Sequence, residues 1–470
     1  MPAHEITRRL RRMLTGSPDT PCVAVGNFEV EEQWAKGELG LPKVRAVRSN
    51  ATVGRMEEFT LFLADSGDAV VLRESPDDDY LSYLDELGVG LPDVVVVARS
   101  AADRTVTEDA LDDPGIVTKM ERYARRGAHL WPHGVSASEE RLATVAHLPL
   151  AVSGAGVSKE VNSKIYSRLV VGQLGLRQPE GTVCRNLDEF DAAVRTAREW
   201  LAAGRSVVLK DAFGVSGKGI LVVHEAARLE LASRMIHRQA DRHGTGRLAL
   251  VMEEWLPKRQ DLNYQFTVGR DGSVRFDVVK EALTRAGVHQ GHRMPAELSS
   301  AHLAELRKTA KAVGLRLADD GYTGVAGIDA IITVDDVLHP VIEINARNNM
   351  STYQERLREL FFSDGEAAVA LRHPLTLHSR ISFGDLRRRI DDLLLSPGGR
   401  AGVIVHNFAT VNAEAPTAGA EPSGFPGRLH AIAVAATPQQ ADALSQALQA
   451  RLDELTAPQD QVTGRSATAE

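Results

Sequence analysis

The sequence has few of the features that mark secreted, membrane-spanning or nucleic-acid-binding proteins. Only two of its 470 residues are cysteines, which is too few for a disulfide framework and fits a reducing cytoplasm. No apolar run approaches the roughly 18 residues that a membrane-spanning helix needs. The start, MPAHEITRRLRRML, is basic and lacks the apolar core of a secretory signal. A net charge of −8 argues against general binding to nucleic acids or membrane surfaces, so we expect a cytoplasmic protein.

What is present is the composition of a globular protein with several domains. The hydrophobic fraction is 43%, and a chain of 470 residues suggests about two to four domains, each with its own core. In residues 1–150, apolar runs that read as strands alternate with helical stretches. The strands are expected at 22–28, 44–48, 69–75, 93–100 and 128–134, and the helices include 31–39 and 76–87. Such alternation predicts a parallel sheet covered on both faces, and therefore a Rossmann-like first domain.

That first domain is predicted to form a wall of a cleft rather than to hold its own nucleotide. Gly26, after the first strand, is a lone glycine and not a dinucleotide fingerprint. The later segment GAGVSK also fails that pattern, because Lys159 stands where the third glycine belongs. A helix is expected over residues 162–176, with Asn162 or Ser163 as its cap. Lys164 then lies in the first turn, where a lysine is unfavourable beside the helix dipole unless it is solvated or an anion lies nearby.

Residues 205–223 contain two β-rich runs joined by the glycine-rich segment FGVSGKG. Lys210 ends the first run and Lys218 lies in the connection. The segment is not a Walker loop, because Ala212 stands at the first glycine position and Gly219 replaces the Ser or Thr. Glycines let a backbone approach a phosphate closely, so a flap over a triphosphate is one interpretation, and an ordinary glycine-rich hairpin is the other.

The next stretch, LALVMEEWLP, predicts a strand that runs into an acidic connector, as at a hinge between two lobes. Backbone groups at a hinge can read an adenine edge, and Asp261 or Asn263 could accept from a ribose hydroxyl; a strand that simply meets solvent is the alternative. The loop 285–295 follows and carries His289, His292 and Arg293. An amphipathic helix is predicted over residues 299–321.

Residues 327–348, GIDAIITVDDVLHPVIEINARN, predict an antiparallel hairpin with acids placed inside apolar strands. Asp329 lies in the first strand and Glu343 in the second, and Asn345 follows Glu343 on the same face. Arg347 joins that face if the strand continues so far. Carboxylate and amide oxygens are ligands of the kind Mg²⁺ uses beside phosphates, whereas a salt-bridged hairpin facing water is the alternative.

Taken in order, these segments closely resemble the ATP-grasp superfamily over about residues 155–360. The pattern ExNxR at Glu343–Arg347 carries most of the resemblance, and the glycine loop flanked by lysines carries the next part. The resemblance implies two α+β lobes that clasp ATP, preceded by the parallel-sheet domain. It implies boundaries at 1–150 for the pre-ATP-grasp domain and 151–371 for the ATP-grasp domain, with the flap lobe at about 180–255 and the metal-binding lobe at about 256–371. A small α+β domain is expected at 372–470.

The resemblance also implies roles for individual residues. The expected metal ligands are Asp329, Glu343 and Asn345, holding Mg²⁺, for which Mn²⁺ can substitute. The expected ATP contacts are Lys164, Lys210, Gly214, Ser216, Gly217, Gly219, Glu253, Glu254, Trp255, Leu256 and Asp261. The expected groups at the transferred phosphoryl are Arg347, Arg293 and Lys218.

Most ATP-grasp enzymes phosphorylate a carboxylate and then join the acyl phosphate to an amine. This implies an ADP-forming carbon–nitrogen ligase whose partners are a small carboxylate and an amine or peptide, with no nucleic acid and no membrane. Two departures limit the resemblance: Ala346 stands where many members have proline, and NNMSTY replaces a glycine-rich continuation. With the C-terminal layout, NNMSTY most resembles the peptide ligases of the pheganomycin-biosynthesis type, which implies antibiotic biosynthesis.

Three alternatives stay open at this point. The chain is either such a ligase or a nucleotide-binding ATP-grasp module with a regulatory or assembly role and no ligase activity. The basic run 387–389 is either a solvated helix face or a substrate contact. The sequence leaves the oligomeric state open, with a homodimer as one option.

Overall fold

The first part of the chain forms a four-stranded parallel sheet with strand order β3-β2-β1-β4. The computed structural model describes residues 5–42, 51–101, 104–214, 219–244, 246–285, 288–363, 365–416 and 424–456. The strands are β1 (Cys22–Val25), β2 (Ala69–Leu72), β3 (Asp93–Val96) and β4 (His129–Pro132). The helices are α1 (Glu5–Thr15), α2 (Val30–Trp34), α3 (Ala51–Gly54), η1 (Arg55–Phe62), α4 (Asp78–Glu86), α5 (Val106–Leu111), α6 (Pro114–Ala124), α7 (Ala137–Val145) and α8 (Ala155–Val161). The predicted parallel α/β domain is therefore confirmed.

Two details of this domain differ from the sequence prediction or lie beyond it. The helix expected over residues 31–39 ends at Trp34, and the chain turns at Gly37, which has a φ of +80° that suits glycine. The strand expected at 44–48 lies outside the described residues.

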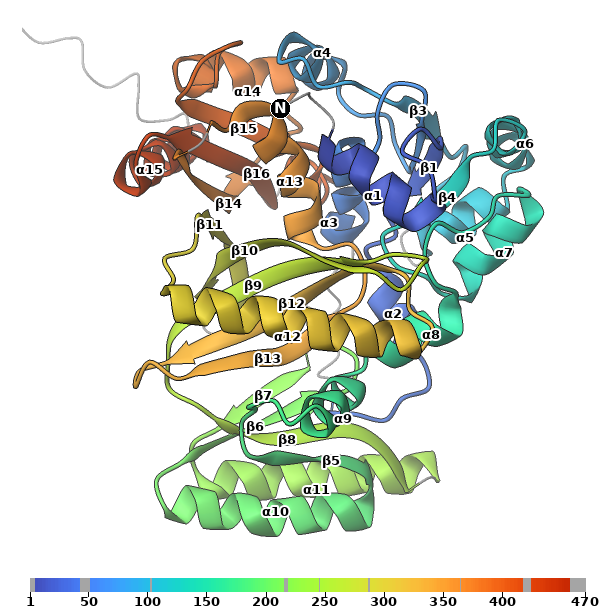
Figure 1. The fold of residues 1–470 in the computed structure, drawn as a ribbon. Helices are drawn as coiled ribbons and strands as arrows, with labels where there is room; N and C mark the ends of the chain where they lie inside the picture. Colours follow the sequence, from blue (N-terminus) through green and yellow to red (C-terminus); the bar gives the residue numbers. More distant parts are fainter. Residues whose placement is uncertain are drawn as a thin grey trace, which may run out of the picture.

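The next unit is a small lobe built on a four-stranded antiparallel sheet with strand order β5-β8-β6-β7. Its elements are α9 (Lys164–Gln173), β5 (Gly181–Asn186), α10 (Leu187–Ala202), β6 (Ser206–Asp211), β7 (Ile220–Val223), α11 (Ala226–His243) and β8 (Arg247–Trp255). The long helices α10 and α11 cover the outer face of this sheet (Figure 1). Phe190 and Ile236 pack from these helices against Leu250, so the lobe has a core of its own. Its other face points toward the rest of the molecule.

The centre of the molecule is an eight-stranded sheet with strand order β13-β12-β9-β10-β11-β14-β16-β15. Its first strands and helices are β9 (Lys258–Val268), β10 (Val274–Arg285), β11 (Val288–Met294), α12 (Ser300–Asp319), β12 (Gly324–Thr333), β13 (Leu338–Asn345) and α13 (Met350–Phe361). The C-terminal elements are β14 (Ala367–Leu377), α14 (Phe383–Ile390), η2 (Asp391–Leu393), β15 (Gly402–Asn407), η3 (Ala409–Val411), β16 (Phe425–Ala435) and α15 (Pro438–Thr456).

The two faces of this sheet differ in chemistry because side chains alternate along each strand. In β9, Tyr264 and Phe266 point to an apolar face, which packs under α12, whereas Asn263 and Gln265 point to the opposite face. Ser351, at the start of α13, donates a hydrogen bond to Asn263 at 2.8 Å on that polar face. The polar face is the one that carries the predicted site residues.

The C-terminal elements extend the central sheet rather than forming a separate layer. Strand β14 pairs with β11 on one side and with β16 on the other, and α15 packs over β14 and β16 (Figure 1). The boundary predicted at residue 372 therefore falls inside a strand. Backbone hydrogen bonds run across it, so the small α+β domain expected there shares its sheet with the ATP-grasp domain.

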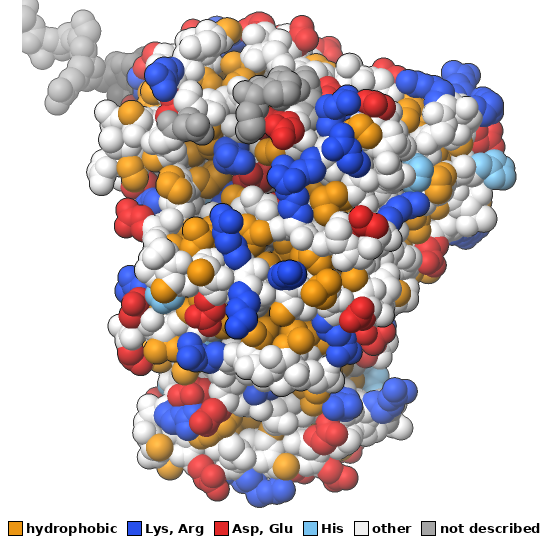
Figure 2. All heavy atoms as spheres, viewed as in Figure 1, with side chains coloured by type: hydrophobic (Ala, Val, Ile, Leu, Met, Phe, Trp, Pro, Cys, Tyr) orange, Lys and Arg blue, Asp and Glu red, His pale blue; other side chains and the backbone are white. Residues whose placement is uncertain are grey.

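The surface and the helices agree with the composition. Acidic and basic side chains are interspersed over the face shown in Figure 2. Within the described ranges, no helix combines the length and apolar character needed to cross a bilayer. Both cysteines are buried and unpaired.

Candidate active site

The predicted hairpin is formed by β12 and β13, and it carries the candidate site residues Asp329, Glu343 and Asn345. Asp329 lies directly opposite Glu343 in the antiparallel pair, and Gly327 lies opposite Asn345. Directly opposed residues share a face, so the two carboxylates lie side by side. Arg347 lies just beyond the end of β13, where its backbone N–H donates to the carbonyl of Asn345 at 3.0 Å.

Lys164 reaches this hairpin from the start of α9. The helix begins where expected: Ser163 is its cap and accepts a hydrogen bond from the backbone of Ile165 at 3.2 Å. The Lys164 ammonium is buried, forms an ion pair with Glu343 Oε1 at 2.7 Å, and donates to the carbonyl of Gly214 at 3.2 Å. Burial alone would depress its pKa, but the charges of Glu343, Glu31 and Asp329 raise the pKa above its ordinary value, so the side chain stays charged.

Arg347 is held by an acid from the first domain. Its guanidinium forms an ion pair with Glu31 of α2 and donates to Asn345 Oδ1 at 3.2 Å. The Nε atom of Arg347 is buried and has no hydrogen-bond partner among the described residues. A buried donor without a partner is costly, so this nitrogen is available to an anion.

We call Asp329, Glu343 and Asn345, with Lys164 and Arg347, the carboxylate centre. Asp329 accepts hydrogen bonds from Asn263 at 2.9 Å and from Asn345 at 3.2 Å. Its pKa is raised to about 6, first by burial and then by the neighbouring Glu343 carboxylate. Two carboxylates held together in a buried place favour a cation between them.

The donor set of the centre fits Mg²⁺. Two carboxylates and one amide supply oxygen ligands only, which is the set that magnesium prefers when it also contacts phosphates. Within the described ranges, this centre included, no group of three or more His, Cys, Asp or Glu side chains is arranged to hold a metal ion. A metal at this centre would therefore depend on Asn345 as well as on the two acids.

Lys210 lies in β6 of the small lobe and is buried beside Glu253 of β8, with which it forms an ion pair. Arg168 of α9 binds the other oxygen of Glu253 at 2.8 Å. Burial opposes the charge of Glu253, but Lys210 and Arg168 lower its pKa below the ordinary value, so it is ionised. Glu253 thus holds two cations beside the lobe junction, and its predicted contact with adenosine stays a prediction.

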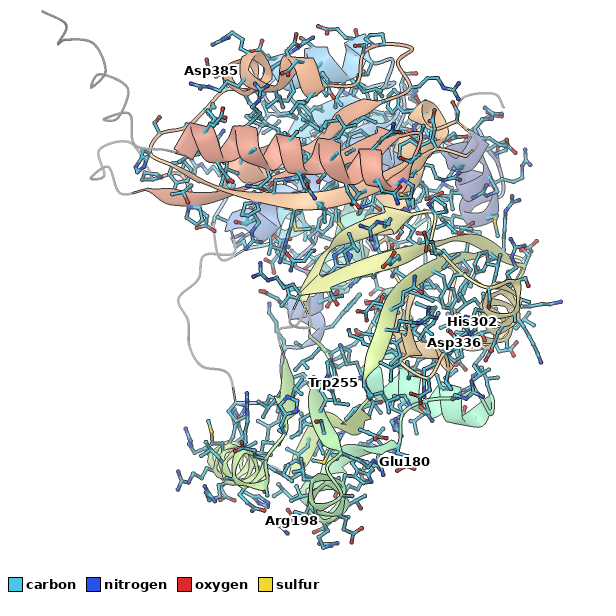
Figure 3. All side chains as sticks on the ribbon, turned by 90° about the vertical axis from the view of Figure 1, so that its left-hand side faces the viewer. Glu180, Arg198, Trp255, His302, Asp336 and Asp385 are labelled. Atoms are coloured by element: carbon cyan, nitrogen blue, oxygen red, sulfur yellow. The ribbon has the colours of Figure 1, made fainter. Side chains whose placement is uncertain are left out.

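The predicted hinge lies where β8 of the small lobe passes into β9 of the central sheet. Figure 3 shows Trp255 at that passage. Trp255 and Leu256 are half-buried, and Lys258 lies over the Trp255 ring at 5.7 Å. Glu254 points away from Glu253 and pairs with Arg205 at 2.5 Å. Asp261, two residues before Asn263 in β9, is bound by Lys258 and by Thr284, both at 2.7 Å.

The glycine loop is described only at its ends. Gly214 accepts the hydrogen bond from Lys164, and Gly219 has a φ of +82° with a Cβ position 2.6 Å from Asp211, so only glycine fits there. Ser216, Gly217 and Lys218 lie outside the described residues, and their predicted roles stay predictions.

Arg293 is not brought to the carboxylate centre by any contact among the described residues. It lies in β11, pairs with Asp442 of α15 at 2.9 Å and lies 3.6 Å from Glu281. These three line an open cavity of about 400 Å³ at the edge of the sheet, together with Arg259. The contact with the C-terminal helix could not be read from a local motif.

Three residues near the site were missed by the sequence analysis. Glu31 comes from a short helix far away in the chain, and Arg168 lies one turn after Lys164 on α9. Lys280 is fully buried in β10, opposite Asn263, and pairs with Glu355 of α13 at 3.0 Å. The one available signal was Lys280 itself, a charged residue inside the apolar run RFDVVKEAL.

Comparison with known proteins agrees with this architecture. A family model for the pre-ATP-grasp domain matches residues 56–148. The butirosin acyl-carrier-protein–L-glutamate ligase of Niallia circulans is 27% identical over 326 residues, which cover 69% of this chain and 71% of that protein.

Solved structures show the same fold at low sequence identity. The biotin carboxylase of Campylobacter jejuni, solved as a β,γ-ATP complex, superposes with a TM-score of 0.55 at 14% identity, covering 92% of each chain. The biotin carboxylase domain of the 2-oxoglutarate carboxylase of Hydrogenobacter thermophilus, solved with MgADP and bicarbonate, gives a TM-score of 0.51 at 14% identity. That match covers 91% of this chain and 88% of the other. The chain therefore has a pre-ATP-grasp domain followed by an ATP-grasp fold.

Proposed function

We propose that the protein is an ATP-dependent, ADP-forming ligase that joins a carboxylate to an amine. The observation that carries the proposal is the carboxylate centre, where Asp329 and Glu343 face Lys164 and Arg347 between the lobes. A binding-only module has no need for acids and cations concentrated at one point. The ligase named among the relatives supports the same chemistry.

The reaction proceeds in two displacements. A carboxylate oxygen of the substrate attacks the γ-phosphorus of ATP, the bond to the β-phosphate oxygen breaks, and ADP leaves. The amine nitrogen then attacks the acyl carbon, the carbon–oxygen bond to phosphate breaks, and the amine proton is lost. The protein supplies mainly position and charge in such transfers.

Each residue of the carboxylate centre has a part in this scheme. Mg²⁺ held by Asp329, Glu343 and Asn345 would neutralise charge on the phosphate oxygens. Lys164 and Lys210 bind the phosphates. To do so, Lys164 releases Glu343 and Lys210 releases Glu253. Arg347, with its free Nε, binds the transferred phosphoryl group. Closure of the two lobes excludes water, which would otherwise hydrolyse the acyl phosphate.

We further propose that the product is a peptide or amide of a secondary metabolite made in the cytoplasm. The resemblance to peptide ligases of the pheganomycin-biosynthesis type supports a peptide acceptor. The relative from Niallia circulans acts on a carrier protein and glutamate, as its name states, which supports an amino acid as one substrate class. Arg293 stays outside the proposed set, because Asp442 holds its guanidinium.

The proposal is tested by a screen of amino acids and peptides for ADP release, with the product mass read directly. The ligase requires ADP and phosphate to appear only when a carboxylate and an amine are both present, with a product lighter than their sum by one water. ATP binding without stimulated turnover by any pair would favour the nucleotide-binding module instead. Release of AMP, or a phosphorylated carboxylate as the end product, would also contradict the ligase.

A further inference from the structure

A second group of charged side chains lies on the polar face of the central sheet, and it contains cations and histidines only. It consists of His289 in β11, Arg372 in β14, and Arg428 and His430 in β16, and we call it the cationic cluster. Arg372 and His430 are directly opposed across β14 and β16, and Arg428 is two residues from His430 on the same face. Arg372 depresses the pKa of His289, after burial, so these two side chains are also close.

The register of the strands places the cationic cluster on the same face as the carboxylate centre. Asp329 is opposite Asn263, which is opposite Lys280 in β10. Ala282, two residues after Lys280 in β10, is opposite His292 in β11. His292 is in turn opposite Ala370 in β14, which lies two residues before Arg372. Because directly paired residues point to one face, the face is continuous across five strands.

The positive charge of the cluster is not compensated by the described part of the chain. None of the described acids forms an ion pair with Arg372 or Arg428. Among the described residues, Arg372 donates only to the neutral side-chain amide of Gln290, at 3.2 Å. The charge of Asp261 acts to raise the pKa of His289, but Asp261 already forms an ion pair with Lys258.

A buried nitrogen beside the cluster is also unsatisfied. His406 in β15 is 2% exposed, and its Nε2 has no hydrogen-bond partner among the described residues. The ring of Phe59 lies 4.6 Å from the ring of His406 and 5.1 Å from that of His430, so both histidines pack against one aromatic ring of the first domain. Unpaired buried nitrogens and arginines without an acid are both groups that an anionic ligand satisfies.

The other arginine-lined cavity provides the contrast. There, Arg293 is matched by Asp442 and Glu281, and Arg259 by Asp336, so each guanidinium already has a carboxylate. Arg428 is exposed, and Arg372, His289 and His430 are partly exposed, so solvent and ligands reach the cationic cluster. The cluster is therefore an accessible site of uncompensated positive charge.

We propose that the cationic cluster binds the anionic far end of an extended substrate whose other end reacts at the carboxylate centre. Asp329 and Arg372 are separated by four strand-to-strand steps, roughly 19 Å at the usual strand spacing, and by about four residues along the strands, roughly 13 Å. The direct span is therefore on the order of 23 Å, which a single amino acid cannot cover and an extended peptide of about seven residues can. The inference rests on the proposed ligase function and names the acceptor as a long, acid-terminated molecule.

Two sources can supply such an anionic end: the C-terminal carboxylate of a peptide, and the phosphate of a phosphopantetheine arm. The test measures binding to the full chain by calorimetry without ATP, so that it does not depend on turnover. The probes are pentaalanine, pentaalanine amide and 4′-phosphopantetheine. Pentaalanine tighter than its amide indicates a peptide carboxylate, and phosphopantetheine as the tightest probe indicates the phosphate.

The variants are Arg372→Gln and Arg428→Gln, and the matched control is Arg388→Gln, which changes an exposed arginine of α14 in the same C-terminal region. Each cluster variant is expected to weaken binding of the preferred anion about tenfold, with little change for the amide and no change in the control. Thermal unfolding of each variant, compared with the unchanged protein, identifies any loss of folding.

The proposal is overturned if neither anionic probe binds the unchanged protein more tightly than the amide, or if the cluster variants bind both anions as well as the control. These outcomes are separable from failure of the ligase proposal. Preferential anion binding without ADP release in any screen would reject the ligase and leave the anion site. ADP release unaffected by the cluster variants would keep the ligase and reject the anion site.

Discussion

The carboxylate centre and the cationic cluster lie on one face of one sheet, yet they balance charge in opposite ways. At the centre, each cation has an acid within the chain: Lys164 pairs with Glu343, and Arg347 pairs with Glu31. In the cluster, Arg372 and Arg428 have no acid among the described residues. If the two proposals hold, a ligand at the centre must displace internal partners such as the Glu343 contact of Lys164, whereas an anion at the cluster displaces no acid of the described chain.

Lys280 lies on the same face between these two groups and belongs to neither. It is fully buried and held by Glu355, Gln354 and the carbonyl of Ser351. Burial lowers the pKa of Lys280, against the opposing effect of Glu355. Lys164 differs from Lys280, because the charges of three acids raise its pKa and keep it charged at the carboxylate centre.

The largest expected effect is at the carboxylate centre. Glu343→Gln removes a negative charge from the proposed metal site, and we expect ADP release with the substrates found by the screen to fall about 100- to 1,000-fold. Calorimetry should show a parallel loss of Mg²⁺-dependent ATP binding. The matched control is Asp336→Asn, an exposed acid in the turn of the same hairpin. Turnover near the unchanged level in Glu343→Gln would remove the centre from the reaction.

The second effect is structural and concerns Lys280. Lys280→Met leaves Glu355 buried without its main partner, so we expect the free energy of unfolding to fall by about 3 kcal/mol in a denaturant titration. The double variant Lys280→Met with Glu355→Leu removes both charges and should recover much of that loss. If Lys280→Met is as stable as the unchanged protein but releases no ADP, Lys280 takes part in the reaction rather than only stabilising the fold.

The third effect is a pH dependence set by the cationic cluster. Burial, followed by nearby arginines, lowers the pKa of His289 to about 4 and that of His430 to about 3. The folded protein keeps both rings neutral, while the unfolded chain binds protons below about pH 6.5, so stability is fully present above that pH and is lost as the pH falls. At pH 5.5, each histidine should lower the free energy of unfolding by about 1 kcal/mol relative to neutral pH.

Urea titrations at several pH values from pH 7.5 to pH 5.5 measure the slope with which the free energy of unfolding falls as the pH falls. The double variant His289→Gln with His430→Gln should have a shallower slope than the unchanged protein. A saturating anionic ligand should also flatten it, because negative charge raises the pKa of both rings. An identical slope in the double variant would show that the two histidines are not the groups that titrate.

The smallest effect is expected at Arg293. Its partly exposed pairing with Asp442 is worth less than about 1 kcal/mol, and Arg293→Gln should change ADP release less than about threefold. A loss of 100-fold with unchanged thermal unfolding would restore the prediction that Arg293 contacts the transferred phosphoryl group.

Local patterns predicted the fold and the hairpin well. The alternation of apolar strands and helices gave the parallel first domain, and the spacing of Asp329, Glu343 and Asn345 gave their shared face. Such features depend on neighbours within a few residues, which the sequence displays directly. The start of α9 at Lys164 was predicted for the same reason, from the capping Ser163.

Long-range partners were not predictable in this way. Glu31 and Arg347 carry no signal that they meet, and neither do Arg372 and His430, which are opposed only because β14 pairs with β16. The continuity of that sheet past residue 372 depends on pairing between strands far apart in the chain. Pairing of that kind is set by the packing of whole layers, which a single sequence does not display.

The ion pair between Glu31 and Arg347 joins two residues that the ribosome adds at very different times. The two residues are 316 positions apart, so at ordinary rates of translation Arg347 is made on the order of 15–60 s after Glu31. One face of the first sheet, at Leu72, packs in a common core with the C-terminal residues Val405 and Ile432. Both that core and the carboxylate centre are therefore completed late in biosynthesis.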